Sequence, residues 1–218
     1  MTVIVACRTA DGTILFGADG QITSTDETLE GTKLLFFPFP NGKALIGMAA
    51  RDVSLGYMRK IELFRALLDV DFDQDPVEVI QKRMARPCED SQNNVQILCA
   101  IVSRTIESPR LLGICDTKVD DISGSTFCCI GSGDEAAHTF LAQIGDCLQS
   151  LRHVQIAVGA SVWLAKQTDS LCGRHTDIWW LNSDLSTGTL ESERIRSWES
   201  HFKTSPPKAL KRWIEGVP

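Results

Sequence analysis

The sequence predicts an α/β (α+β) protein folded as a four-layer sandwich, in which two mainly antiparallel sheets pack face to face and helix pairs cover their outer faces. Two observations predict this class. Short β-branched runs occur in hairpin-like pairs, and they alternate with two pairs of segments that have helical periodicity. A chain of 218 residues can bury a sizeable core. We therefore expect one domain over residues 1–191 and a C-terminal tail over residues 192–218.

Two hairpins are predicted at the start of the chain. The first joins residues 2–8 to residues 13–18 through Asp11-Gly12, and the second joins residues 33–39 to residues 44–48 through Asn41-Gly42. Both dipeptides favour tight turns, because glycine and asparagine or aspartate tolerate positive φ. We expect the two hairpins together to form one sheet.

Apolar residues recur at three- and four-residue spacing in four later segments, which predicts four helices. The first covers residues 52–70, and the second begins at Pro76 and ends near Pro87. The second pair covers the residues from Gly133 to Leu148 and about residues 151–166.

The remaining apolar runs predict strands. Residues 95–103, 110–115 and 126–130 separate the two helix pairs, and a late hairpin begins at residues 176–182. The tail mixes charged and aromatic residues around Pro206-Pro207, which predicts a short helix, a loop and a second short helix. We expect this tail to pack on the domain or on a neighbouring subunit.

Composition excludes several classes of function. The chain is 43% hydrophobic and 23% charged, with a net charge of -6, so it gives no electrostatic basis for binding nucleic acid or an anionic membrane. No apolar stretch is long enough to span a bilayer. Most of the 8 cysteines lie in apolar runs without Cys-x-x-Cys pairs, which favours reduced thiols in a cytoplasmic protein. The four histidines lack metal-ligand spacing, so we expect no metal and no cofactor.

The second residue of the chain has the chemistry of a nucleophile. Initiator methionine is commonly removed before a small residue, so the mature chain would begin at Thr2 with a free α-amine. A threonine hydroxyl needs an adjacent base, and its own α-amine can serve as that base. An α-amine titrates near pH 8, so a substantial fraction of it is neutral at working pH and can accept the proton.

Two charged residues are candidates for tuning such a nucleophile. A lysine ammonium near the threonine favours the neutral amine and a developing alkoxide, and an aspartate keeps that lysine charged and in place. Lys33 and Asp19 are the candidates for these two roles. Alternatively, Asp19 is only a turn residue and Lys33 a solvated charge at the start of a strand.

Several segments, in the same order along the chain, resemble the proteasome β-subunit family, and the Asp-Gly-Gln triplet resembles its bacterial branch, the HslV peptidase. The resemblance implies an N-terminal nucleophile hydrolase fold. It rests on residues 2–6 (TVIVA), 17–23 (GADGQIT), Lys33, 44–49 (ALIGMA), 130–133 (IGSG) and 168–173 (TDSLCG).

The resemblance also implies three further site residues. The backbone N–H of Gly47 would hold the oxyanion of the tetrahedral intermediate, and Ser132 and Asp169 would support the α-amine of the nucleophile. Ser132 is equally suited to cap the helix that follows it. Cys172 stands where the family has a serine.

The function implied is a threonine endopeptidase that hydrolyses peptides or unfolded proteins within a homo-oligomeric ring, fed by an ATP-dependent unfoldase. Two alternatives remain open: a noncatalytic proteasome-like assembly or scaffold subunit, and an amidase of the same fold that acts on a small molecule. The first hairpin has one residue more than the bacterial pattern. In the noncatalytic alternative Met1, and not Thr2, would occupy the nucleophile position.

Overall fold

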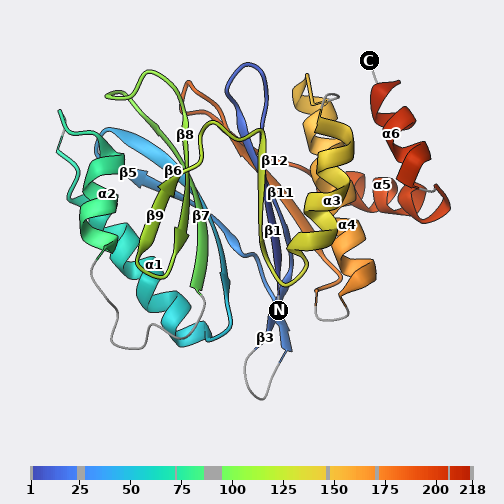
Figure 1. Ribbon diagram of the computed structural model, residues 1–218, viewed down its shortest axis with the longest axis horizontal. Helices are drawn as coiled ribbons and strands as arrows, with labels where there is room; N and C mark the ends of the chain where they lie inside the picture. Colours follow the sequence, from blue (N-terminus) through green and yellow to red (C-terminus); the bar gives the residue numbers. More distant parts are fainter. Residues whose placement is uncertain are drawn as a thin grey trace.

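The computed structural model is a sandwich of two five-stranded antiparallel sheets with helices on both outer faces (Figure 1). It describes residues 2–23, 28–71, 73–85, 95–145, 148–169, 172–205 and 207–216. Helices α1 and α2 cover one sheet, and α3 and α4 cover the other, with α5 and α6 outside them (Figure 1). The four-layer class predicted from the sequence is therefore confirmed.

The first sheet has the strand order β10-β1-β2-β11-β12, and all its neighbouring strands are antiparallel. Its centre is the hairpin of β1 and β2, whose residues are almost all buried because the other sheet lies on one side and α4 on the other. The strands are β1 (Val3–Arg8), β2 (Ile14–Asp19), β10 (Phe127–Gly131), β11 (Thr176–Leu181) and β12 (Thr187–Thr189).

The second sheet has the order β5-β6-β7-β8-β9. The expectation that the two N-terminal hairpins share one sheet is wrong, because β5 and β6 belong to this second sheet. Between the hairpins, the chain forms a small two-stranded unit, β3 (Gln21–Thr23) and β4 (Thr28–Glu30), and then enters the opposite layer. The strands are β5 (Leu34–Phe39), β6 (Gly42–Ala50), β7 (Val95–Ser103), β8 (Arg110–Cys115) and β9 (Lys118–Asp121).

Packing explains why the hairpins separate. Each has one apolar face for the inner core, and those faces meet: Ile4 and Phe16 from the first hairpin join the same buried cluster as Leu45 from the second. Facing sheets bury both surfaces at once, whereas side-by-side hairpins would need another partner layer.

The four predicted helices form and begin close to the expected residues, but α2 ends at Met84 and α3 at Ile144, short of the predicted ends near Pro87 and at Leu148. Asp52, Asp75 and Ser150 each accept hydrogen bonds from backbone N–H groups in the first turn of α1, α2 and α4, as N-cap residues do. The helices are α1 (Val53–Leu68), α2 (Pro76–Met84), α3 (Asp134–Ile144) and α4 (Leu151–Thr168). Pro87, where the second helix was expected to end, lies outside the described residues.

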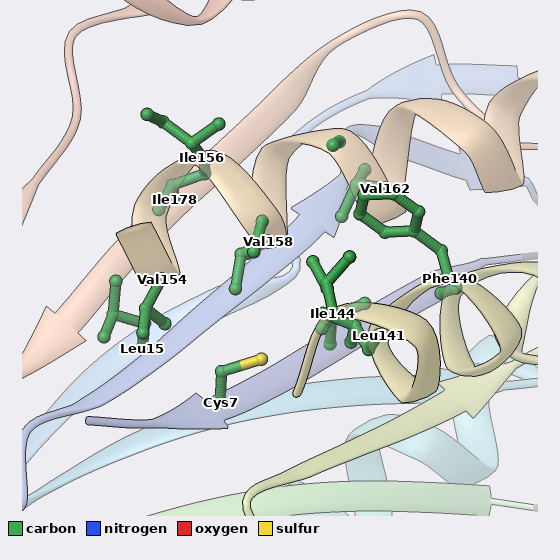
Figure 2. Close-up of a cluster of buried hydrophobic side chains, with 14 of the residues drawn as sticks. Cys7, Leu15, Phe140, Leu141, Ile144, Val154, Ile156, Val158, Val162 and Ile178 are labelled. Carbon is green, nitrogen blue, oxygen red and sulfur yellow. The ribbon is translucent and has the colours of Figure 1, made fainter. Parts of the chain in front are cut away.

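The outer face of the first sheet meets α3 and α4 in a second buried cluster (Figure 2). Val158 and Val162 of α4, Leu141 and Ile144 of α3 and Cys7 of β1 are all buried in this cluster. Cys7 is fully buried, and burial raises the pKa of its thiol well above the usual value. This thiol therefore packs as a small apolar side chain.

Six described cysteines are free thiols, and five of them are buried or half-buried, whereas Cys115 is exposed. Cys88 and Cys147 lie outside the described residues. Within the described part of the chain, no helix has both the length and the apolar character that crossing a bilayer needs.

The C-terminal tail forms α5 (Ser192–Thr204) and α6 (Pro207–Glu215), which pack against the outer side of α4 (Figure 1). Phe202, Leu210 and Ile214 are buried in the α3–α4 cluster. A buried ion pair also ties α5 to α4, with Lys166 Nζ 2.6 Å from Glu199 Oε1. The same nitrogen donates to Thr176 Oγ1 at 2.7 Å, so the tail is joined to the strand beside β2.

Breaking this pair is expected to destabilise the fold. Glu199→Gln would leave the Lys166 ammonium, whose side chain is only 7% exposed, without its counter-charge. Removing one partner of a buried pair costs about 3 kcal/mol or more of the free energy of unfolding. Thermal unfolding should then show a melting temperature lower by roughly 6–12 °C.

The exposed pair between Arg83 and Asp69 is the matched control. Its side chains are 41% and 54% exposed, so Asp69→Asn should cost less than about 1 kcal/mol. Equal shifts in the two variants would contradict the assignment of Lys166 and Glu199 as an anchor of the tail.

Candidate active site

Thr2 lies directly before β1 and is held by the turn that connects β10 to α3. Its backbone nitrogen donates to Ser132 Oγ at 3.3 Å, and its carbonyl oxygen accepts from the Gly133 N–H at 3.3 Å. The residue is 7% exposed. Met1, the alternative occupant of the nucleophile position, lies outside the described residues.

Gly131 makes the close approach of Thr2 possible. Its φ is +97°, in the region that favours glycine, and a Cβ at this position would lie 2.1 Å from the Thr2 carbonyl oxygen. Any side chain at residue 131 would therefore displace the start of β1. The sequence signal for this role is the segment of residues 130–133, in which two glycines flank Ser132.

Asp19 ends β2 opposite the start of β1, and its carboxylate is completely buried. Oδ1 accepts the backbone N–H of Val3 at 2.8 Å, and Oδ2 accepts the backbone N–H of Gly173 at 2.7 Å. Asp19 is therefore attached to the residue that follows Thr2 and is no simple turn residue.

Lys33 precedes β5 and pairs with Asp19. Its Nζ lies 2.8 Å from each carboxylate oxygen, and its side chain is 7% exposed, which rules out a solvated position. Burial lowers the pKa of the Lys33 ammonium below its usual value, and the Asp19 carboxylate acts in the opposite direction. Between the two sheets, Asp19 thus brings Lys33 to the start of β1.

Ser132 and Asp169 form a second polar group, which contacts the backbone nitrogen of Thr2. Ser132 Oγ donates to Asp169 Oδ2 at 2.5 Å, so the hydroxyl connects the Thr2 nitrogen to a carboxylate. The alternative that Ser132 caps α3 is wrong, because Gly133 is the N-cap residue and no side chain caps this helix.

One short loop links the two carboxylates of the site. Asp169 follows α4, its carbonyl accepts the N–H of Cys172 at 3.1 Å, and the next residue donates to Asp19. Burial, with the carboxylates of Asp19 and Asp169, raises the pKa of the Cys172 thiol to about 12. This thiol therefore stays protonated and cannot act as a nucleophile near neutral pH. The intervening residues 170–171 lie outside the described part of the chain.

Gly47 lies on β6, between Leu34 of β5 and Leu98 of β7. A Cβ at this position would lie 2.8 Å from Ile4 Cγ2, so close packing of the two sheets by itself requires a glycine here. The oxyanion role of Gly47 stays a prediction.

The structure places five of the six predicted residues in two hydrogen-bonded groups at the start of β1: Thr2 with Ser132 and Asp169, and Lys33 with Asp19. The two groups are joined through the backbone, because Asp19 accepts the N–H groups of Val3 and Gly173. Sequence reasoning missed the backbone donors Val3 and Gly173, because every residue except proline has a backbone N–H group and the residue type does not show which of them bind the site. Across the described segments, no group of three or more His, Cys, Asp and Glu side chains is arranged to hold a metal ion.

Solved structures share this architecture over the full length of the chain. An Anbu (Gly-1) mutant from Hyphomicrobium sp. strain MC1 aligns with 100% of this chain and 98% of its own, at a TM-score of 0.76 and 14% identity. The chain has the Anbu fold. Anbu (ancestral beta-subunit) from Yersinia bercovieri aligns with the same coverage at a TM-score of 0.74 and 14% identity.

A third Anbu structure, the helical assembly of the Anbu complex from Pseudomonas aeruginosa, aligns with 100% of this chain and 97% of its own, at a TM-score of 0.71 and 16% identity. No protein-family model and no curated protein matches the sequence. Anbu is a proteasome β-like relative of the N-terminal nucleophile hydrolases, so the predicted fold is confirmed. The similarity defines the fold and not the chemistry, and the resemblance to the HslV branch stays a prediction.

Proposed function

We propose that the chain is an N-terminal nucleophile threonine peptidase that becomes active when Met1 is removed. Thr2 Oγ1 attacks the carbonyl carbon of a peptide bond, and the proton of the hydroxyl passes to the α-amine of the same residue. The amine then gives this proton to the leaving nitrogen, and water hydrolyses the acyl-enzyme ester.

The observation that carries this proposal is the buried Lys33–Asp19 pair, anchored at the residue next to Thr2. Asp19 contacts Lys33 Nζ at 2.8 Å and the Val3 N–H at 2.8 Å, so the ammonium is held against the first strand. A cation in this position stabilises a developing alkoxide and favours the neutral form of the α-amine. Burying two charges costs desolvation free energy that their attraction often only offsets, so a buried ion pair is by itself a weak source of stability.

The hydrogen bond from the Thr2 nitrogen to Ser132 supports the role of the α-amine. After Met1 is removed, this nitrogen is the terminal amine, and Ser132 Oγ, itself bound to Asp169, fixes its position. Gly47 is the candidate oxyanion donor, a role that is worth about 3 kcal/mol of transition-state stabilisation in other enzymes.

A covalent inhibitor tests the proposal directly. We expect an epoxyketone to add to residue 2 of the purified protein, as measured by intact mass and peptide mapping, because this warhead reacts with both a hydroxyl and an adjacent amine. Thr2→Ala should form no adduct, whereas the control Thr187→Ala, on the exposed strand β12, should react like the unaltered protein.

Other results would favour the alternatives. A retained Met1 with no adduct would support a noncatalytic assembly subunit. An adduct on residue 2, combined with turnover of small amides and not of peptides, would support an amidase. A correctly trimmed chain that forms no adduct would contradict the threonine mechanism.

Self-association is the second part of the proposal. On α1, Tyr57, Met58, Ile61 and Leu68 are between 46% and 56% exposed, which is unusual for large apolar side chains. This helix lies on the outermost layer of the molecule (Figure 1). The Anbu complex from Pseudomonas aeruginosa, a protein of the same fold, forms a helical assembly. We therefore assign the exposed face of α1 to a contact between copies of this chain.

Ile61→Lys is expected to reduce the assembly measured by light scattering after size exclusion, because a charge would be buried in the contact. Gln167→Lys, on an exposed site of α4, is the control and should leave the molar mass unchanged. If both variants retain the same assembly, α1 is not the contact. Feeding by an ATP-dependent unfoldase stays a prediction from the resemblance.

A further inference from the structure

A cavity of about 490 Å³ lies in the groove between α3 and α4. It begins at Ser132 and Asp169 and runs along both helices, past Glu135, Thr139, Phe140 and Leu164. Two of the residues that line its near end, Ser132 and Asp169, therefore belong to the candidate active site.

The near end of the cavity is acidic. Asp169 and Glu135 supply carboxylates there, and among the described residues that line the cavity none is Lys, Arg or His. Glu135 forms no ion pair with any described residue. Lys211 of α6 donates from its Nζ to the Gln143 carbonyl oxygen at 3.1 Å, and Gln143 lines the far end of the cavity.

The walls of the cavity are apolar. Phe140, Leu164 and Ala136 line it, so an aliphatic stem would be shielded from water while a charged head reaches the carboxylates. A lysine or arginine side chain has this combination of a long stem and a cationic head. An acidic side chain would face two carboxylates and be rejected.

The position of Ser132 indicates which part of a bound peptide substrate would lie next to the cavity. In the proposed mechanism, the α-amine of Thr2 gives its proton to the leaving nitrogen, so that nitrogen must lie within hydrogen-bond reach of the amine. Ser132 contacts the Thr2 nitrogen and also lines the cavity. The near end of the cavity therefore adjoins the nitrogen that protonates the leaving group in the proposed mechanism.

We propose that this cavity is the subsite for the side chain of the first residue on the leaving-group side, and that it selects lysine or arginine. The assignment rests on the proposed peptidase function. It follows from charge and position together, because the acidic end of the groove is also the end that adjoins the amine.

Two measurements test the subsite separately from the peptidase function. The first is binding of the product-like dipeptides Lys-Leu and Glu-Leu to the Met1-free protein by calorimetry, which needs no turnover. We expect Lys-Leu to bind about fivefold more tightly, which corresponds to the ~1 kcal/mol that a partly exposed ion pair can contribute. The second is cleavage of quenched peptides that differ only in having Lys or Glu after the scissile bond.

Variants of the cavity sharpen the test. Glu135→Gln should remove most of the preference for lysine, and Thr139→Trp should abolish Lys-Leu binding because its indole fills the groove. Neither residue belongs to the catalytic network, so epoxyketone addition to Thr2 should be unchanged in both variants. Gln167→Trp, an exposed residue of α4 outside the cavity lining, is the matched control and should bind like the unaltered protein.

Equal affinity for the two dipeptides, or binding that survives Thr139→Trp, would overturn the subsite while leaving the peptidase mechanism intact. Failure of the epoxyketone to add to a trimmed chain would overturn both the mechanism and the leaving-group role, even if Lys-Leu still bound.

Discussion

Asp19→Asn is expected to abolish turnover and to destabilise the protein at the same time. The carboxylate is fully buried and accepts bonds from Lys33, Val3 and Gly173. An amide has only one acceptor oxygen, so its NH₂ group would face a donor, and the buried ammonium would lose its counter-charge. Leaving one partner of such a pair alone costs about 3–5 kcal/mol of the free energy of unfolding.

Activity should fall by roughly 100- to 10,000-fold, the range over which positioned proton-transfer groups act. Thermal unfolding and the rate of epoxyketone addition measure the two effects. Asp120→Asn, on the surface strand β9, is the control and should change neither quantity, because its pair with Lys118 is exposed.

A double variant separates structure from chemistry. Asp19→Asn combined with Lys33→Met removes the uncompensated charge, so part of the lost stability should return. The reaction rate should not return, because the proposed mechanism needs the Lys33 ammonium that this variant removes. Recovery of the rate together with the stability would show that the pair is only structural.

Gly131→Ala is expected to slow the reaction of Thr2 by shifting the backbone at the start of β1, without removing any side chain of the site. A Cβ would lie 2.1 Å from the Thr2 carbonyl oxygen, and the φ of +97° is strained for alanine. The strain and the forced shift together should cost about 2–4 kcal/mol of the free energy of unfolding. A displacement of Thr2 by an ångström would slow the covalent reaction by roughly 100-fold.

Gly124→Ala is the matched control, since a Cβ at residue 124 meets no atom within 4 Å. We expect it to keep the stability and the adduct rate of the unaltered chain. Full activity in Gly131→Ala would mean that the start of β1 can move without loss, and the rigid placement of Thr2 would then be no part of the mechanism.

The sequence by itself determined most of the elements and the reactive groups that are proposed for the site. Hairpins, helices and the strands of residues 95–103 and 110–115 follow from periodicity and turn residues, which act locally. The strands β3, β4 and β9 were missed because runs of three or four residues carry too little pattern. The charged residues Asp19 and Lys33 stood out because their chemistry complements that of Thr2.

Only the tertiary structure decided which sheet each hairpin joins. The alternation of residues along a strand identifies its apolar face, and both hairpins have such a face. Whether the hairpins pair side by side or pack face to face depends on how the whole core is filled. The same holds for the anchors of Asp19, because Val3 and Gly173 act through backbone N–H groups that every non-proline residue carries. The sequence thus specified the reactive groups. Their contacts were decided by the packing of the two sheets and by the loop that follows α4.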